Sequence, residues 1–236
     1  LILCPLSVIE TAWIDDCKKF YPELKITNCW ATSSKKRFDA MAIDSDVYVM
    51  NYESFKILKK KILAMDFQCV IVDESQVMKN MGAQITNELL QLIDVIPHRF
   101  VLSGTPTPNH NSEIFPQMKF VDADIFGNNF FGFQAHYFTQ DMQNPHRWYQ
   151  TQENKEAYFN RLREKSVFLK KEDCVDLPPK VFQIKEFDLG SEQKRHYNNM
   201  VKNIKDNINE WSKFEFTAKL MKLREIVSGF VINKEG

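Results

Sequence analysis

Two adjacent carboxylates end an apolar run, where Val70, Ile71 and Val72 are followed directly by Asp73 and Glu74. An apolar strand that delivers neighbouring carboxylates suits metal–nucleotide chemistry, because adjacent side chains at a strand end can take different tasks. Asp73 would hold a magnesium ion through its water shell, while Glu74 would polarise the water that attacks a terminal phosphate. A bare Asp-Glu pair is more often an acidic loop, so this pair alone does not decide the chemistry.

A second polar group follows another apolar run: Ser103, Gly104 and Thr105 come directly after residues 100–102. Small hydroxyl residues beside a glycine let the backbone approach a ligand and offer hydrogen bonds to carboxylates or to a phosphate-bound water. By itself this segment is a turn. The order of strand, carboxylate pair, helix, strand and hydroxyl turn is what makes the two signals specific together.

Four short apolar runs are predicted to be the strands that position these residues, namely 1–4, 47–50, 69–72 and 100–102. Each is apolar on both faces, as parallel strands covered by helices on both sides must be. Helical patterns between the runs favour βαβ units. Polar residues follow every run, and the carboxyl ends of parallel strands meet at one edge, so the sequence predicts an α/β fold with a ligand crevice there.

The first run leads into a predicted helix, where Ser7 and Glu10 have the spacing of a capping box. One face of this helix carries residues at intervals of three and four that are expected to pack on the sheet, namely Ile9, Ala12, Trp13, Cys17 and Phe20. The N-terminus would lie at the crevice, where free N–H groups can receive a phosphate oxygen. The plain alternative is a capped helix with no ligand.

The pattern changes beyond residue 110, where prolines precede a stretch rich in aromatic residues, namely Phe126, Phe130, Phe131, Phe133, Tyr137 and Phe138. This predicts an added, mostly helical subdomain with a Phe-rich core. A helix is expected from Asn154 to Arg163 and a strand from Lys180 to Leu189. A long amphipathic helix should follow, with an apolar stripe of Tyr197, Met200, Val201, Ile204, Ile208 and Trp211, and a shorter helix should end at Ser228.

The composition limits the classes of partner. Basic and acidic residues both number 31, so the net charge is zero and any nucleic-acid contact must be local. The five cysteines include no CxxC pair, which argues against a zinc site or a secreted disulfide framework. No apolar run is long enough to predict a membrane span. We expect a reducing location inside the cell, nuclear in a eukaryote or cytoplasmic in a bacterial or viral host.

These motifs resemble the Swi/Snf-type translocases of helicase superfamily two over nearly the whole chain. Residues 3–7 with Trp13 are similar to motif Ia of that family, and residues 49–53 to motif Ib. Residues 73–76 with Lys79 and Asn80 resemble motif II, and residues 103–106 with Asn109 resemble motif III. Residues 168–171, 177–180 and 223–226 resemble the end of the helical protrusion and the helix leading into the second lobe. Gln76 stands where the family usually has His, and Thr107-Pro108 where Leu-Gln is more typical.

The resemblance implies a RecA-like parallel sheet flanked by helices, the P-loop NTPase fold, in a DNA-dependent ATPase that moves on duplex DNA and remodels protein–DNA complexes. It implies ATP and Mg²⁺ as cofactors, and a monomer that contacts the phosphate backbone and DNA-bound protein. The catalytic residues implied are Asp73, as the magnesium ligand, Glu74, as the base, and Gln76. Coupling is implied for Ser103, Gly104 and Thr105, and DNA contact for Ser7, Asn51, Tyr52, Lys79 and Asn80.

The resemblance also predicts the domain organisation: lobe one at 1–110, a helical protrusion at 111–180, and a strand and helices leading toward lobe two at 181–236. None of the seven glycines is followed by Lys and Ser or Thr, so the phosphate-cradling GxxxxGK[ST] loop is missing. In the family that loop precedes motif Ia, so we expect a chain truncated ahead of it and lacking the arginine-bearing second lobe. The isolated chain is therefore expected not to hydrolyse ATP.

Two alternatives remain open from the sequence. Another superfamily-two motor, such as an RNA helicase or a restriction translocase, would share the carboxylates but lack the helical protrusion and the Leu-Pro-Pro-Lys segment at 177–180. A non-catalytic DNA or protein interaction domain could also have kept the motor fold.

Overall fold

The computed structural model describes residues 1–144, 147–169, 174, 181–207 and 211–229. Contacts divide the chain into two compact units, Leu1–Leu169 and Lys170–Gly236, which are described separately below. The boundaries expected from the sequence, after residues 110 and 180, stay predictions. Within the described residues, no helix combines the length and the apolar character needed to cross a membrane.

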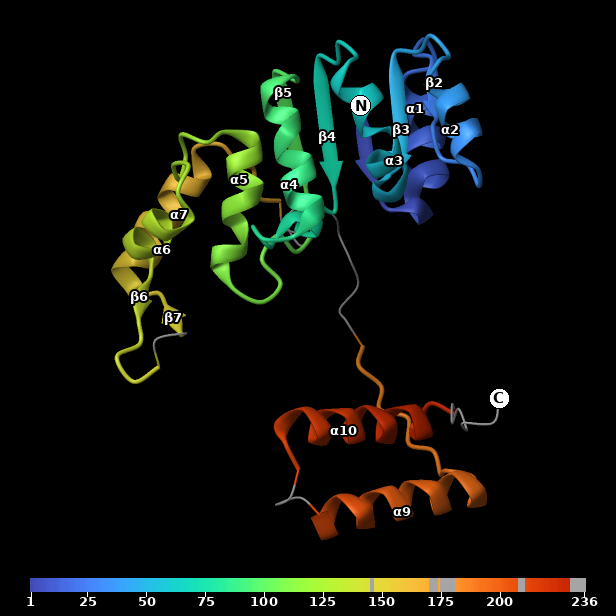
Figure 1. Ribbon diagram of the computed structural model, residues 1–236, viewed down its shortest axis with the longest axis vertical. Coiled ribbons are helices and arrows are strands. Elements are labelled where there is room, and N and C mark those ends of the chain that lie inside the picture. Colours follow the sequence, from blue (N-terminus) through green and yellow to red (C-terminus); the bar gives the residue numbers. More distant parts are fainter. Residues whose placement is uncertain (145–146, 170–173, 175–180, 208–210, 230–236) are drawn as a thin grey trace. The chain divides into compact units, whose positions relative to one another are not determined.

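The first unit is built on a parallel sheet with the strand order β2-β3-β1-β4-β5 (Figure 1). Its strands are β1 (Ile2–Cys4), β2 (Ile26–Asn28), β3 (Val47–Asn51), β4 (Cys69–Asp73) and β5 (His98–Leu102). The four predicted strands are confirmed, and β2 is an additional strand at the edge beside β3. Because every neighbouring pair is parallel, the carboxyl ends of all five strands lie at one edge of the sheet.

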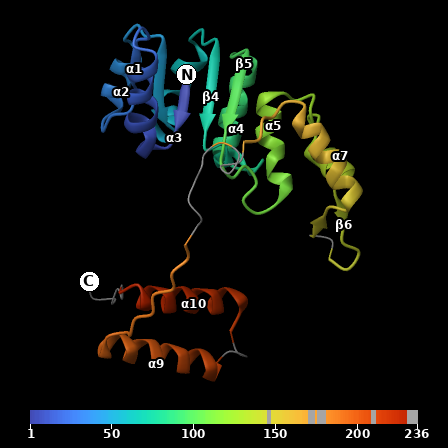
Figure 2. The same ribbon diagram turned by 180° about the vertical axis from the view of Figure 1, so that it is seen from behind.

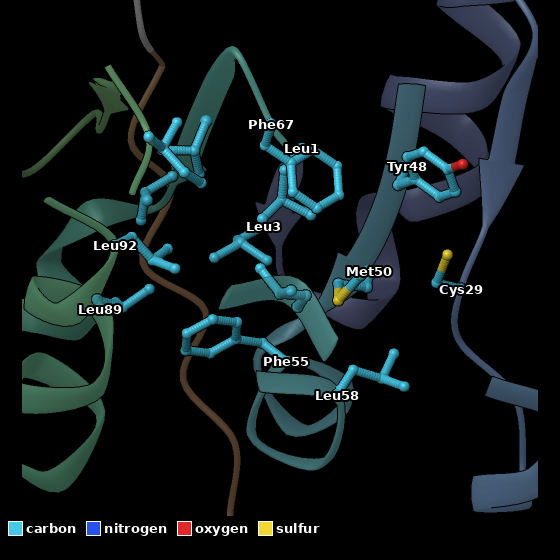
Figure 3. Packing of buried hydrophobic residues seen from close by; sticks show 14 of the residues in the cluster. Leu1, Leu3, Cys29, Tyr48, Met50, Phe55, Leu58, Phe67, Leu89 and Leu92 are labelled. Atoms are coloured by element: carbon cyan, nitrogen blue, oxygen red, sulfur yellow. The ribbon is translucent and has the colours of Figure 1, made fainter. Parts of the chain in front are cut away.

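Successive residues of the central strands enter two different hydrophobic clusters. Leu3 and Met50 pack with Phe55 and Leu58 of α3 (Tyr52–Leu63) and with Leu89 of α4 (Gln84–Leu90) (Figure 3). On the other face, Ile2, Cys4 and Val49 pack with Ile9 and Ile14 from the helical segment after β1. This alternation is what a strand with a two-residue side-chain period requires when both faces are covered. Three further short helices complete this part: α2 (Ser34–Ala40), η3 (Ser75–Met78) and η4 (Gln91–Asp94).

The prediction of burial on both faces is wrong for β5. Phe100 is 56% exposed and Leu102 is 45% exposed, although β5 pairs with β4 along its length. In the part of the chain that the structure describes, no strand pairs with the outer edge of β5 and no helix covers this face. The apolar run therefore identified the strand correctly but not its surroundings.

The helix predicted after β1 is divided into a 3-10 turn, η1 (Leu6–Val8), a π-helix, η2 (Ile9–Ile14), and α1 (Asp15–Phe20). The predicted capping box between Ser7 and Glu10 is wrong: no side chain caps either η1 or η2, and Glu10 Oε1 instead accepts a hydrogen bond from Asn28 Nδ2 at 2.6 Å. A π turn contains more residues than an α turn, so residues spaced by three and four positions no longer lie on one face of this helical segment. Ala12 and Phe20 are exposed as a result.

The segment after β5 forms the predicted, mostly helical subdomain. It contains η5 (Asn111–Ile114), α5 (Phe115–Val121), α6 (Phe130–Tyr137) and α7 (Gln152–Arg163), with a small hairpin of β6 (Thr139–Gln140) and β7 (Trp148–Tyr149) (Figure 1; Figure 2 shows the same part from behind). Its core is Phe-rich as predicted, with Phe115, Phe126, Phe133 and Phe138 buried, but Phe131 is 77% exposed. Helix α7 begins two residues before the predicted Asn154, because Thr151 caps it through a hydrogen bond from Asn154 N to Oγ1.

The second unit contains α9 (Ser191–Asn207) and α10 (Lys213–Val227), which confirm the two predicted helices. Ile204 of the predicted apolar stripe is buried, while Ile208 lies outside the described residues and Trp211 follows the end of α9. The strand predicted from Lys180 to Leu189 is wrong over its described residues: 181–189 have no regular secondary structure, and Phe182 and Ile184 are 88% and 91% exposed. The Leu-Pro-Pro-Lys segment at 177–180, Lys170 and Lys171 also lie outside the described residues.

Candidate active site at the carboxyl edge of the sheet

The two candidate catalytic carboxylates stand where β4 ends. Asp73 is the last residue of the strand and is partly buried, whereas Glu74 is exposed. Glu74 adopts φ 51° and ψ 52°, and it is the one non-glycine residue with a positive φ among the described residues. This left-handed conformation costs an L-residue about 1–2 kcal/mol, and such strain concentrates at functional sites. It turns the chain sharply from β4 into η3.

Asp73 is held from three directions. Its Oδ1 accepts a hydrogen bond from Glu74 N at 2.9 Å, and its Oδ2 accepts one from Trp13 Nε1 at 3.1 Å. The backbone carbonyl of Asp73 accepts a hydrogen bond from the Tyr52 hydroxyl. A carboxylate oxygen has two lone pairs, so one on each oxygen stays free for a water of a hydrated cation. The donor set therefore fits a magnesium ion held through water.

Glu74 is connected to the loop after β5 by a chain of hydrogen bonds. Gln76 Nε2 donates to Glu74 Oε2 at 2.7 Å, and Ser103 Oγ donates to Gln76 Oε1 at 2.7 Å. Thr105 N in turn donates to Ser103 Oγ at 3.0 Å. The structure thus brings together predicted catalytic and coupling residues from two strand ends. Gly104 is exposed, and a Cβ placed there would meet nothing within 4 Å.

Two ionisable groups behind the carboxylates are kept neutral. Burial, and then the charge of Asp73, raise the pKa of the Cys4 thiol to about 12. Burial raises the pKa of the Tyr52 hydroxyl as well, with further contributions from Asp73, Cys4 and Glu74. Both groups stay protonated at neutral pH, so Tyr52 remains a hydrogen-bond donor to the Asp73 carbonyl.

The five predicted DNA-binding residues lie at or after the carboxyl ends of strands, but their side chains differ in exposure. Ser7 and Asn80 are exposed, and Lys79 is partly exposed at the end of η3. Asn51 is buried and caps α3, with its Oδ1 accepting a hydrogen bond from Ser54 N at 3.0 Å. The Tyr52 hydroxyl is bound to the Asp73 carbonyl. The side-chain polar atoms of Asn51 and Tyr52 therefore form hydrogen bonds within the protein. Contact of these five residues with DNA stays a prediction.

A buried pair, Ser75 and Gln117, was not identified from the sequence. Ser75 Oγ donates to Gln117 Oε1 at 2.7 Å, and the two residues are 1% and 0% exposed. Gln117 Nε2 donates to the carbonyls of Pro106 at 2.7 Å and Glu113 at 3.0 Å. This amide joins the end of β4 to the loop after β5. The sequence offers no distinct signal for this pair, since residues 114–120 contain Lys119 as well as Gln117.

Replacing Gln117 by Leu should lower the free energy of unfolding by about 1–3 kcal/mol, because the buried Ser75 hydroxyl loses its acceptor. Urea denaturation measures this change. The same substitution at the exposed Gln91 is the matched control and should change stability by less than about 0.5 kcal/mol. Equal stability of the two variants would contradict a structural role for this amide.

The turn that follows Thr105 is closed by Glu113. Its carboxylate accepts hydrogen bonds from Asn109 N at 3.0 Å and Asn109 Nδ2 at 2.8 Å, and from His110 N at 3.5 Å. Burial acts to raise the pKa of Glu113, but these hydrogen bonds, together with the charge of Lys79, bring it below its usual value. Glu113 is therefore stabilised as a carboxylate by the loop that it closes, with Lys79 as a nearby positive charge.

Among the described residues, no group of three or more His, Cys, Asp or Glu side chains is arranged to hold a metal ion. A magnesium ion that Asp73 holds through water would take its ligands from water and from phosphate oxygens. This is the usual arrangement for magnesium in phosphoryl-transfer sites, because the ion gives up its water reluctantly.

Comparison with known proteins supports the same family. A family profile described as SNF2-related domain matches residues 1–232. The chain is 29% identical over 229 residues to the CHD3-type chromatin-remodeling factor PICKLE of Arabidopsis thaliana, covering 84% of this chain and 15% of that protein. It is 25% identical over 250 residues to Putative protein p41 of Acyrthosiphon pisum secondary endosymbiont phage 1, covering 100% of this chain and 54% of p41.

The fold is that of a solved ATPase core. The Sulfolobus solfataricus SWI2/SNF2 ATPase core in complex with dsDNA aligns with a TM-score of 0.58 and 22% identity, over 96% of this chain and 47% of that one. The predicted RecA-like α/β fold is thereby confirmed. The chain spans 15% of the length of PICKLE and about half of p41.

Proposed function

Because the chain belongs to the SNF2-related domain family, we propose that it is part of a DNA-dependent ATPase that moves on duplex DNA and remodels protein–DNA complexes. The observation that carries this proposal is the hydrogen-bonded chain from Glu74 through Gln76 to Ser103, beside the restrained carboxylate of Asp73. It combines a base, a metal ligand and a connection to a second strand end at one edge of the sheet.

In this proposal Glu74 is the general base. Its Oε2 is occupied by Gln76 Nε2, which leaves Oε1 to accept a proton from the attacking water. Asp73 would hold a hydrated magnesium ion with the free lone pairs of its carboxylate. Magnesium, when bound, neutralises charge that develops on the phosphoryl group. The strained backbone of Glu74 keeps its carboxylate out of the line of β4 and next to Gln76.

Gln76 and Ser103 provide the proposed coupling. Ser103 belongs to the loop after β5, and its hydroxyl is bound to the same amide that holds Glu74. A displacement of this loop would break the Ser103–Gln76 hydrogen bond and release the amide that orients the base. The loop is thus the route by which DNA contact can change hydrolysis.

Duplex DNA is the proposed partner, as it is the ligand of the Sulfolobus ATPase core. A chain with no net charge offers no general basic field, so binding must come from a local row of contacts with the phosphate backbone. Lys79 is the cation of this row, and the exposed Ser7 and Asn80 are its polar members.

Binding of a short labelled duplex by this chain is therefore expected to be weak, insensitive to sequence and lost as salt rises. Replacing Lys79 by Glu should weaken it further and lower the slope of log affinity against log salt by about one, because one phosphate contact is lost. Fluorescence anisotropy at about 50 and about 200 mM salt measures both effects.

Lys155→Glu is the matched control for this experiment, since Lys155 is an exposed lysine on α7, away from the strand ends. It should leave both the affinity and the salt slope close to those of the wild type. Affinity that does not depend on salt, or a strong preference for one sequence, would contradict binding along the phosphate backbone.

The family match favours a Swi/Snf motor over an RNA helicase or a restriction translocase. A non-catalytic interaction domain would keep the fold without hydrolysis, so ATPase measurements separate it from the proposed function.

We also propose a reducing location inside the cell. The cysteines of this chain carry free thiols, which is consistent with that location.

A further inference from the structure

The indole N–H of Trp13, its one polar side-chain group, forms a hydrogen bond with the carboxylate of Asp73. The indole has a single N–H and no acceptor, and this N–H donates to Asp73 Oδ2 across sixty residues of sequence. The rest of the ring is partly buried against the cluster formed by Ile2, Cys4 and Ile9 on the face of β1. Ring packing thus holds the donor in place beside the carboxylate.

The π turn decides which side chain of this segment meets Asp73. Trp13 lies inside η2, where Asp15 N donates to the carbonyl of Glu10, five residues back. A π turn contains an extra residue relative to an α turn, and such turns occur preferentially at functional sites. The change of helix type from η1 to η2 to α1 therefore sets the direction of the indole.

We infer that Trp13 is a positioning residue for the magnesium-binding carboxylate. Glu74 N restrains Oδ1 and Trp13 restrains Oδ2, so the two donors together fix the plane of the carboxylate. Without the indole N–H, only the neighbouring backbone amide restrains it. The inference rests on the proposed function in one respect, the assignment of magnesium to Asp73.

The hydrogen bond can be tested in this chain without nucleotide. The four tryptophans give four indole N–H signals in an NMR spectrum. The signal that disappears in Trp13→Phe is that of Trp13. Asp73→Ala should shift the Trp13 signal and speed its hydrogen exchange, while the other three stay in place. An unchanged Trp13 signal with unchanged exchange would overturn the inference, even if Trp13→Phe itself folds poorly.

The positioning role can be tested in an ATPase-competent motor that contains this chain, a phosphate-binding loop and a second lobe. Trp13→Phe keeps an aromatic ring and removes the N–H, so it should raise the magnesium concentration for half-maximal hydrolysis about tenfold. The rate at saturating magnesium should recover most of its wild-type value. Trp30→Phe, beyond the end of β2 at the far edge of the sheet, should leave both unchanged.

The outcomes separate the inference from the proposed function. Unaltered magnesium dependence in Trp13→Phe, with hydrolysis abolished in Asp73→Ala, would overturn the positioning role alone. Wild-type hydrolysis by Asp73→Ala would overturn the assignment of magnesium to Asp73, and the inference with it.

Discussion

Replacing Glu74 by Gln is expected to abolish DNA-stimulated ATP hydrolysis in a motor that contains this chain, a phosphate-binding loop and a second lobe. The amide cannot accept the proton of the attacking water, and a positioned general base contributes on the order of a hundredfold to ten-thousandfold in rate. The loss should appear in kcat at saturating DNA and ATP, since the base acts on the chemical step. A steady-state phosphate-release assay measures it.

The same substitution should leave the fold intact. Glu74 is exposed, and the oxygen of a glutamine can still accept the hydrogen bond from Gln76 Nε2. The free energy of unfolding should change by less than about 0.5 kcal/mol. Glu23→Gln, at an exposed carboxylate between α1 and β2, is the matched control and should hydrolyse ATP like the wild type. Hydrolysis by Glu74→Gln within a few-fold of that control would show that another group is the base.

The 236-residue chain is expected to bind magnesium-ATP in the millimolar range or not at all. Asp73 and Glu74 supply the metal and water side of a site, and both carry negative charge that opposes a triphosphate. The main source of triphosphate affinity in such folds is a loop whose N–H groups and Lys surround the phosphates, and none of the seven glycines belongs to a GxxxxGK[ST] motif. A dissociation constant of 1 mM corresponds to only about 4 kcal/mol.

Isothermal titration calorimetry on the chain decides this point. The control is a protein in which a GxxxxGK[ST] segment is supplied ahead of β1, which should bind the nucleotide at least a hundredfold more tightly. Micromolar affinity of the chain without that segment would mean that other residues surround the phosphates, and the assignment of the site would have to change.

Four of the five strands of the parallel sheet, and the position of Asp73 and Glu74 at a strand end, could be predicted because local sequence determines them. The run Val70 to Val72 is short, apolar and β-branched, as a buried strand is, and the polar pair directly after it stands at the strand end. Strand β2 was missed because Ile26, Thr27 and Asn28 form a short, mixed edge strand with no apolar run.

The errors arose where a pattern depends on distant partners. The residues of β5 are apolar, but whether Phe100 is covered depends on neighbours that its own sequence does not specify. Residues 181–189 alternate like a strand, yet a strand requires a partner for its backbone groups. In the second unit, as far as it is described, no partner strand is present.

The contacts of Trp13 and Gln117 also could not be predicted from the sequence. A tryptophan on a predicted packing face gives no sign that its N–H meets an aspartate sixty residues away. Its direction depends on a π turn, which no capping or periodicity rule predicted. Gln117 was not identified, because its partners, Ser75 of η3 and the carbonyl of Pro106 in the loop after β5, come from separate parts of the chain.

If this chain belongs to a DNA-dependent ATPase whose base is Glu74, hydrolysis must depend both on duplex DNA and on the Glu74 carboxylate. Phosphate release should be measured for the complete motor with and without duplex DNA, beside Glu74→Gln. Duplex DNA should stimulate hydrolysis by the wild type at least tenfold, and Glu74→Gln should show no stimulation. Hydrolysis that is equal with and without duplex DNA, or that DNA stimulates equally in Glu74→Gln, would contradict this assignment.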